Sequence, residues 1–313
     1  MVSLLSIGEC MMELIDEGEN TFARTYAGDT YNAAVYAKRY LASINVSMLT
    51  AVGTDFISDA MLAQFASEGI DCSLVGRCER ALPGIYAIAT DEQGERSFNY
   101  WRRNSAATQM ITLLQCGDGF KALPAFDYVY FSGLSLAILN DNDKAGLLSM
   151  VQGLRKRGAK IVFDPNYRAT MWSDVEHAQS WLQRAYQCTD IALPGLEDHI
   201  AVFKHDSEEA INDFLHKIGV TEVVVKSGES GVFGYSAGEQ VAFCEYRPAG
   251  NQVDSTAAGD SFAGTYLALR IAGSDIAESI SLSSQVARFV VQHRGAIVAK
   301  DEYSNFICEL QAS

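Results

Sequence analysis

The sequence contains no run that approaches the roughly 18 unbroken apolar residues of a membrane span, so we expect no membrane insertion. Positive charge is also scarce, because 24 Lys and Arg stand against 39 Asp and Glu and leave a net charge of −15. Since that average field repels a polyanion, the composition disfavours nucleic-acid binding. A small anionic ligand is compatible with this chain only where basic side chains are gathered locally.

Cysteine and histidine are present without the spacing of a disulfide framework or a metal site. The seven cysteines are scattered and form no C-x-x-C pair, and the five histidines show no metal-ligand spacing. This pattern fits reduced thiols in the cytoplasm. Residues 1–9 lack the basic flank and small-residue cleavage site of a signal peptide, so we expect a first buried strand there. We therefore predict a cytoplasmic protein.

Short apolar runs alternate with amphipathic stretches along the chain. The runs predict strands over 4–8, 46–52, 127–132, 160–164, 190–194 and 222–226. The amphipathic stretches predict helices over 29–42, 57–68, 142–157, 174–187 and 207–218, with Asp174 and Ser207 among the candidate caps. This alternation is typical of an α/β protein whose helices cover both faces of a mainly parallel sheet. We expect one domain over 1–313.

A different pattern occupies residues 84–103. Two strand-like segments, 84–90 and 96–101, flank the polar turn sequence 91–95, which predicts a β-hairpin. A hairpin inserted into an α/β pattern indicates a small accessory sheet. We expect residues 12–27 to join it and the resulting sheet, 12–27 with 84–103, to form a lid.

Polar and glycine-rich segments follow several predicted strands. In open α/β sheets, ligands bind outside the carboxyl ends of the strands. Loops are polar in most proteins, so this composition alone marks only a candidate edge of the sheet. The segments are 132–135, 164–168, 194–197 and 226–231.

Small residues precede the apolar helical stretch that follows position 260. Ala257, Ala258 and Gly259 allow backbone N–H groups at the helix start to face an anion. Asp260 lies in the first turn, where a carboxylate could deprotonate a hydroxyl that attacks phosphorus while the amides hold the developing charge. An acid that only favours the helix N-terminus is the alternative for Asp260.

A second glycine-containing segment lies near the other end of the chain, at 27–34. Gly28 lets the backbone approach a sugar, and Asp29 and Asn32 supply hydrogen-bonding groups for its hydroxyls. Asp29 or Thr30 could instead cap a helix.

Together the two segments closely resemble the signatures of the ribokinase-like (PfkB) sugar kinases. They occur in the family's order, and the resemblance covers essentially the whole chain. It implies a three-layer αβα ribokinase-like fold with a mainly parallel central sheet and a small β-sheet lid. It also implies ATP as phosphoryl donor, Asp260 as general base and the 257–260 backbone as anion hole. The implied sugar contacts are Gly28, Asp29, Thr30, Tyr31, Asn32 and Asp260, and the implied nucleotide contacts are Lys226, Ser227, Gly228, Glu229, Ser230, Gly231, Ala257, Ala258 and Gly259.

Other phosphoryl-transfer and nucleotide motifs are absent. The chain has no P-loop and no paired H-R-D and D-F-G sequences. A dinucleotide-binding G-x-G-x-x-G does not follow the first strand, which argues against an NAD-dependent dehydrogenase.

The implied Mg²⁺ site departs from the family pattern. Many relatives carry N-x-x-E, whereas here Pro194 replaces the asparagine and Glu197 keeps the acid. Because Mg²⁺ retains several waters, Glu197 could act through water, or it could be an exposed helical acid. Asp254 could orient the anion loop at 257–260 or, as in some relatives, hold a monovalent cation. A simple turn or helix cap is the alternative role for Asp254.

A local gathering of aromatic and basic residues bears on the substrate. Alternation places Tyr100 and Arg102 on one strand face, with Tyr86 on the other arm, and arginine is well shaped for a carboxylate. With Asn166 and Arg168, which also approach ATP, these residues resemble the 2-keto-3-deoxygluconate kinases in particular. The implied reaction yields 2-keto-3-deoxy-6-phosphogluconate, and the resemblance implies a homodimer through the lids. A neutral-sugar kinase of the fructokinase or ribokinase type and a non-catalytic sugar-sensing homologue are the alternatives.

Overall fold

A mixed β-sheet forms the centre of the computed structural model, which describes residues 1–18, 21–90, 96–117, 119–120 and 123–312. Among the described residues its strands are β1 (Ser3–Ile7), β4 (Asn45–Val52), β5 (Ile70–Asp71), β6 (Val75–Arg77), β9 (Tyr128–Ser132), β10 (Lys160–Asp164), β11 (Ile191–Ala192), β12 (Glu222–Lys226), β13 (Val232–Ser236) and β14 (Glu239–Cys244). Their order is β14-β13-β12-β11-β10-β9-β1-β4-β5, with β6 also paired to β4. Neighbours from β12 to β5 are parallel, and β13 and β14 extend one edge in antiparallel fashion.

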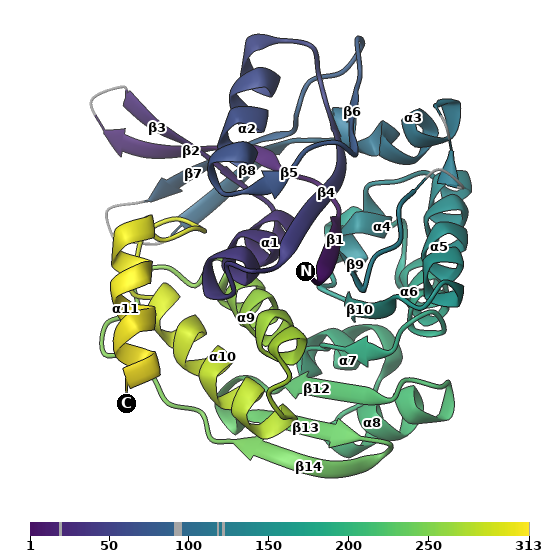
Figure 1. Ribbon diagram of the computed structural model, residues 1–313, viewed down its shortest axis with the longest axis vertical. Coiled ribbons are helices and arrows are strands. Elements are labelled where there is room, and N and C mark those ends of the chain that lie inside the picture. Colours follow the sequence, from purple (N-terminus) through teal and green to yellow (C-terminus); the bar gives the residue numbers. More distant parts are fainter. Residues whose placement is uncertain (19–20, 91–95, 118, 121–122, 313) are drawn as a thin grey trace.

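Helices cover both faces of this sheet (Figure 1). They are α1 (Asp29–Tyr40), α2 (Phe56–Ser67), α3 (Met110–Cys116), α4 (Gly133–Ala137), α5 (Asp141–Lys156), α6 (Val175–Tyr186), α7 (Leu196–Phe203), α8 (Glu208–Lys217), α9 (Ala258–Ala272), α10 (Ile276–Val290) and α11 (Lys300–Ala312). The predicted caps are confirmed, since Asp174 and Ser207 accept hydrogen bonds from the N–H groups of His177 and Ala210. No helix within the described residues is both long and apolar enough to cross a membrane.

Two apolar layers hold the helices onto the sheet. Leu4 and Leu5 are adjacent in β1 and point to opposite faces, as strand alternation requires. Leu5 joins a buried cluster with side chains of α5, α6 and α8, whereas Leu4 joins a separate one with α1, α9 and α10. The expected α/β fold with a mainly parallel sheet is confirmed.

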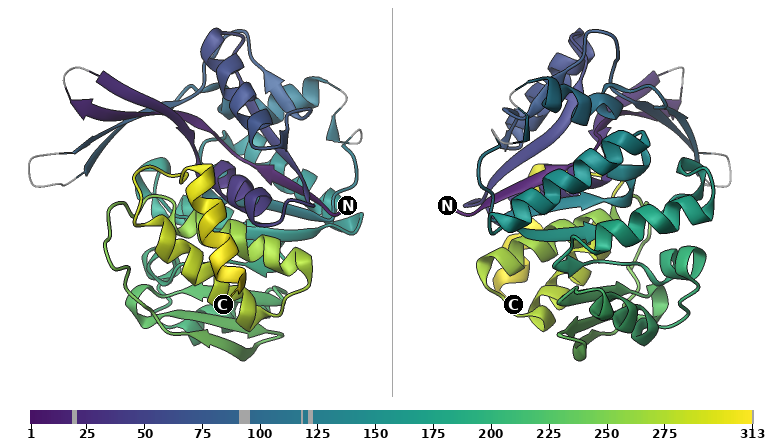
Figure 2. Two further views of the ribbon diagram at one scale, coloured as in Figure 1. Left: turned by 60° about the vertical axis from the view of Figure 1, so that its left-hand side comes forward. Right: turned by 90° about the vertical axis from the view of Figure 1, so that its right-hand side faces the viewer.

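A separate four-stranded sheet projects from the body of the molecule (Figure 2). It consists of β2 (Met11–Gly18), β3 (Thr21–Ala27), β7 (Ile85–Thr90) and β8 (Arg96–Trp101), in the order β3-β2-β7-β8. The predicted strands of the hairpin are β7 and β8, and the predicted turn at 91–95 lies outside the described residues. Met11, Tyr86 and Ile88 of this sheet pack against Ala257, so it adjoins the start of α9.

Candidate active site

The two glycine-containing segments meet because α1 and α9 pack at close range. A Cβ on Gly264 of α9 would lie 2.3 Å from the carbonyl oxygen of Ala33 in α1, so only glycine permits this approach. Next to this contact, the Nδ2 of Asn32 donates a 2.8 Å hydrogen bond to Oδ2 of Asp260. Helix packing therefore brings the first turns of α1 and α9 together.

Asp260 lies half-buried in the first turn of α9. Burial, together with the neighbouring charges of Asp29 and Asp164, raises the pKa of its carboxyl group to about 7, and the hydrogen bond from Asn32 and the charge of Lys226 oppose that rise. A carboxyl group with a pKa near the working pH is well matched to general-base chemistry. The arrangement is therefore suited to taking a proton from a hydroxyl.

The residue before α9 has a strained backbone. Ala257 occupies the N-cap position with φ 61° and ψ 15°, in the left-handed region. An alanine there costs roughly 1–2 kcal/mol, and such strain concentrates at functional sites. No side chain caps α9. Its first turn is consequently open to an anion, as the sequence predicts for Ala258 and Gly259.

A chain of polar contacts joins residues 27–34, the predicted sugar segment, to the end of β12. Asn166, with φ 31°, donates from Nδ2 to Asp29 at 2.8 Å, and its N–H donates to Asp164 at 3.1 Å. The Nζ of Lys226 then donates to the other oxygen of Asp164 at 2.6 Å. The structure thus brings together Asp29, Asn166 and Lys226 around Asp164, which the sequence analysis had not assigned to the site.

Asp198 is the acidic residue of α7 that lies near the charges of Asp164 and Lys226. Burial first, and then Asp164, raise the pKa of Asp198 to about 6, while Lys226 and Arg168 act in the opposite direction. The neighbouring Glu197 is exposed, so its metal role stays a prediction. Within the described residues, no group of three or more His, Cys, Asp or Glu is arranged to hold a metal ion.

Asp254 is buried and ties the loop before α9 to the chain beyond α10. Its two oxygens accept hydrogen bonds from the N–H groups of Thr256 and Gly295, at 2.9 and 2.7 Å. These are the contacts that orientation of the anion loop requires. The monovalent-cation role of Asp254 stays a prediction.

A cavity of about 620 Å³ opens beside the start of α9 and lies within the size range of small-molecule sites. One side is lined by the predicted Lys226, Ser227, Gly228, Gly231, Ala258 and Gly259. The predicted Glu229 and Ser230 are exposed and do not line it, and neither does Ala257.

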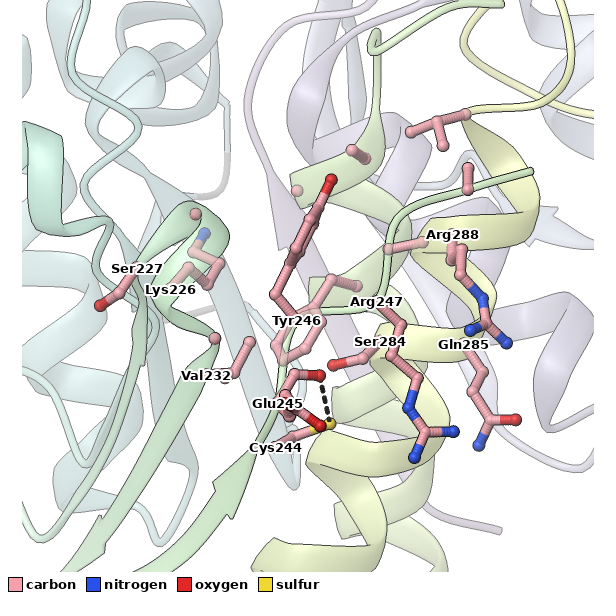
Figure 3. A pocket seen from close by; sticks show the side chains of 18 of the residues that line it. Lys226, Ser227, Val232, Cys244, Glu245, Tyr246, Arg247, Ser284, Gln285 and Arg288 are labelled. Carbon is pink, nitrogen blue, oxygen red and sulfur yellow. Dashed lines mark hydrogen bonds between the residues drawn. The ribbon is translucent and has the colours of Figure 1, made fainter. Parts of the chain in front are cut away.

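The opposite wall of the cavity was not predicted. It comes from the segment after β14 and from α10, whose polar side chains gave no distinctive spacing. Figure 3 shows Lys226 and Ser227 on one side and Tyr246, Arg247, Gln285 and Arg288 on the other.

The predicted aromatic and basic residues of the small sheet are brought together. Tyr86 is buried, donates its hydroxyl to Glu13 at 2.5 Å and stacks on the exposed Tyr100 with ring centroids 5.6 Å apart. The guanidinium of Arg102 lies 6.0 Å from the Tyr100 ring centroid. Arg168 is exposed beyond the end of β10.

Three of the predicted sugar contacts in the segment 27–34 have buried side chains, namely Thr30, Tyr31 and Asn32. Thr30 and Tyr31 are fully buried, and Tyr31 stacks on Phe65 with centroids 4.6 Å apart. These side chains pack inside the protein, so any sugar contact there would have to use the backbone. Gly28 and Asp29 are half-buried, as an accessible binding segment requires.

Comparison with known proteins agrees with the resemblance found in the sequence. The family model described as pfkB family carbohydrate kinase matches residues 1–302. The chain is 40% identical to the 2-dehydro-3-deoxygluconokinase of Escherichia coli (strain K12), with 94% of this chain and 96% of the relative covered. It is 36% identical to that of Haemophilus influenzae (strain ATCC 51907 / DSM 11121 / KW20 / Rd), with 99% of each covered.

Solved structures confirm the fold. The 2-dehydro-3-deoxygluconokinase of Thermotoga maritima is similar with a TM-score of 0.81 at 20% identity, over 98% of this chain and 100% of that one. A PfkB protein from Polaromonas sp. JS666 is similar with a TM-score of 0.83 at 23% identity, over 98% and 100%. The family match spans both glycine-containing segments, the second of which includes Asp260, and the chain belongs to the pfkB family of carbohydrate kinases.

Proposed function

We propose that this carbohydrate kinase uses ATP to phosphorylate 2-keto-3-deoxygluconate and forms 2-keto-3-deoxy-6-phosphogluconate. The near-complete match to 2-dehydro-3-deoxygluconokinases at 36–40% identity supports this substrate. The observation that carries the proposal is the position of Asp260. Its carboxylate contacts the predicted sugar segment through Asn32, and the preceding residues Ala258 and Gly259 line the cavity, which Asp260 itself does not line.

The proton acceptor in this reaction would be Asp260. Asp29 and Asn32 would hydrogen-bond the sugar and hold its terminal hydroxyl near that carboxylate. Asp260 would take the hydroxyl proton as the oxygen attacks phosphorus, and the amides at the start of α9 would bind the phosphoryl oxygens. Lys226 lies beside the same helix start, with its Nζ 3.9 Å from the position of a Cβ on Gly259, where it would add positive charge.

The acidic cluster fits a divalent cation. The raised pKa of Asp198, caused by burial and then by Asp164, indicates that Lys226 and Arg168 do not fully balance these carboxylates. Mg²⁺ accepts few protein ligands and keeps several waters, so Asp164 and Asp198 would hold it largely through water, and Glu197 stays the acid predicted from the sequence. When bound, the ion would neutralise charge on the phosphates. We extend the proposal to a monovalent cation near Asp254.

The small sheet is proposed as a lid on a single catalytic domain over 1–313. Closure over the sugar would exclude water that could otherwise accept the phosphoryl group. The aromatic side chains of Phe22, Phe98 and Trp101 in this sheet are exposed and available for contact with a second copy of the chain. We therefore extend the proposal to a homodimer through the lids, and we propose a cytoplasmic location from the sequence.

A coupled ADP-release assay with Mg²⁺ and ATP tests the substrate. The panel is 2-keto-3-deoxygluconate, fructose, ribose, tagatose and adenosine. We expect the highest kcat/KM with the keto acid. A higher value with a neutral sugar would favour the fructokinase or ribokinase type, and ADP at background with every sugar would favour the sensing homologue.

A further inference from the structure

Glu9 follows β1 at the junction between the central sheet, the start of α1 and the small sheet. Its side chain is buried, and Gly84 makes room for its carboxylate, whereas Gly28 makes room for its backbone. A Cβ on Gly28 would lie 2.0 Å from the Glu9 carbonyl oxygen, and a Cβ on Gly84 would lie 2.9 Å from its Oε1. The chain therefore builds a specific place for this carboxylate, although no step of the proposed reaction uses it.

The partner of Glu9 is Arg102, the residue predicted to meet the substrate carboxylate. Oε2 of Glu9 accepts a hydrogen bond from Arg102 Nε at 2.8 Å and lies 2.5 Å from Nη2. The other oxygen, Oε1, accepts from the hydroxyl of Ser105. The Arg102 and Glu9 side chains are only 10% and 3% exposed, so neither charge is balanced mainly by water.

This pairing leaves a defined part of the guanidinium for a ligand. Glu9 accepts at the Nε and Nη2 edge of the guanidinium. No described residue accepts a hydrogen bond from Nη1. A planar guanidinium presents a second pair of donors through Nη1 and the outer hydrogen of Nη2. Because Glu9 fixes the plane of the group, those donors have one direction, which lowers the entropy cost of binding a carboxylate.

We propose that Glu9 is a positioning and specificity-determining residue, which holds Arg102 so that its free edge receives the carboxylate of a sugar acid. The inference rests on the proposed keto-acid substrate. Glu9 acts through Arg102 and does not touch the reacting atoms. It links the central sheet to the small sheet, so the carboxylate contact depends on both parts of the molecule.

A double-mutant cycle tests this role. Glu9→Gln keeps the size of the side chain and weakens its hold on Arg102, so we expect KM for the keto acid to rise about tenfold while kcat and KM for ATP change less than about twofold. In an Arg102→Ala background, the same Glu9→Gln change should leave KM for the keto acid unaltered. Glu239→Gln, at an exposed position on β14, is the matched control.

Ser105→Ala is the second variant in case Glu9→Gln does not fold. It removes only the Ser105 hydrogen bond to Glu9, so we expect a smaller rise in KM that also disappears without Arg102. An unchanged KM in both variants, or an equal rise with and without Arg102, would overturn the inference. The wild-type substrate panel reports separately on the proposed function, so the two failures are distinguishable.

Discussion

Asn32 and Asp260 lie 228 positions apart in the chain, and the Asn32 side-chain amide donates a 2.8 Å hydrogen bond to the Asp260 carboxylate. This bond connects the sugar segment to the anion loop. It also favours the ionised form of a carboxyl group whose pKa is raised, chiefly by burial. Burial and the neighbouring charge of Asp29 raise the pKa of the proposed base, and this amide opposes the rise.

Replacement of the base should abolish most of the activity. Asp260→Asn keeps the shape of the side chain and removes its ability to take a proton, so kcat should fall by about 10²–10⁴-fold. ADP release measures the loss, with far-UV circular dichroism and KM for ATP as controls for folding. A decrease of less than about tenfold would contradict a general-base role.

The pH dependence follows from the raised pKa of Asp260. Because the carboxyl group titrates near pH 7, kcat/KM should fall as the pH drops below about 7 and Asp260 becomes protonated. Asn32→Leu removes the hydrogen bond that favours the charged form, so this limb should move to higher pH. A pH–rate profile of both proteins measures the shift. A wild-type profile that is flat down to about pH 5 would be inconsistent with Asp260 as the base.

The substrate carboxylate should depend on Arg102. A charge-assisted hydrogen bond of about 1.5–3 kcal/mol corresponds to a loss of about 10- to 150-fold in kcat/KM for the keto acid on Arg102→Ala. Arg103→Ala, at the adjacent exposed position, is the matched control and should change little. A loss below about twofold with Arg102→Ala would remove this residue from substrate recognition.

The close contact of α1 and α9 should tolerate no added methyl group. Gly264→Ala places a Cβ 2.3 Å from the Ala33 carbonyl oxygen, which should lower the free energy of unfolding by ~1–3 kcal/mol. By separating Asn32 from Asp260, it should also lower kcat. Urea unfolding and ADP release measure the two effects. Gly153→Ala is the control, because that α5 glycine has open space and should gain about 0.5–1 kcal/mol. Equal stability of the two variants would refute the packing argument.

The buried His199 should make the protein sensitive to acid. His199 accepts or donates at 2.8 Å with the Tyr186 hydroxyl, and its Nδ1 lies 3.1 Å from that of His205. Burial, and secondarily His205, lowers the pKa of His199 to about 3. In the unfolded chain the His199 imidazole takes up a proton near pH 6.5, whereas in the folded chain it stays neutral. The free energy of unfolding therefore decreases as the pH falls below about 6.5, by up to ~1.4 kcal/mol per pH unit.

The His199 effect can be isolated with variants. The urea midpoint of wild type should fall more between about pH 7.5 and 5.5 than that of His199→Gln, which lacks the titrating group. His216→Gln, at an exposed position on α8, should behave as wild type. The same pH dependence in all three proteins would argue against His199 as its source.

Sequence patterns predicted the central strands better than the edge of the sheet. The strands at 160–164 and 222–226 are found at the predicted residues, because each is an apolar run bounded by polar ends. The antiparallel strands β13 and β14 were not predicted, since buried and exposed residues do not alternate clearly along either strand. In α10 the buried face includes Ser279 and Ser283, which weakens its apolar periodicity.

The residues of the candidate site, like the strands, could be predicted only in part from the sequence. The sequence singled out Asp260 and the segment 27–34 because short strings of small and polar residues mark them, and the structure brings the two together, whereas their roles stay predictions. Asp198 was not, because successive helical side chains differ by about 100° in direction, so whether Glu197 or Asp198 faces the cluster depends on how α7 packs. The second wall of the cavity depends in the same way on how α10 lies against the segment after β14.

The parallel pairing of β2 with β7 has a consequence for biosynthesis. These strands are neighbours in the small sheet, yet α1, β4 and α2 lie between them in the chain. Parallel neighbours need such a crossover, and closing a long loop is slow. On the ribosome, the small sheet therefore cannot be completed until residue 101 has been synthesised, and Asp260 emerges later still. The nascent protein would therefore contain all strands of the small sheet well before the proposed catalytic base is synthesised.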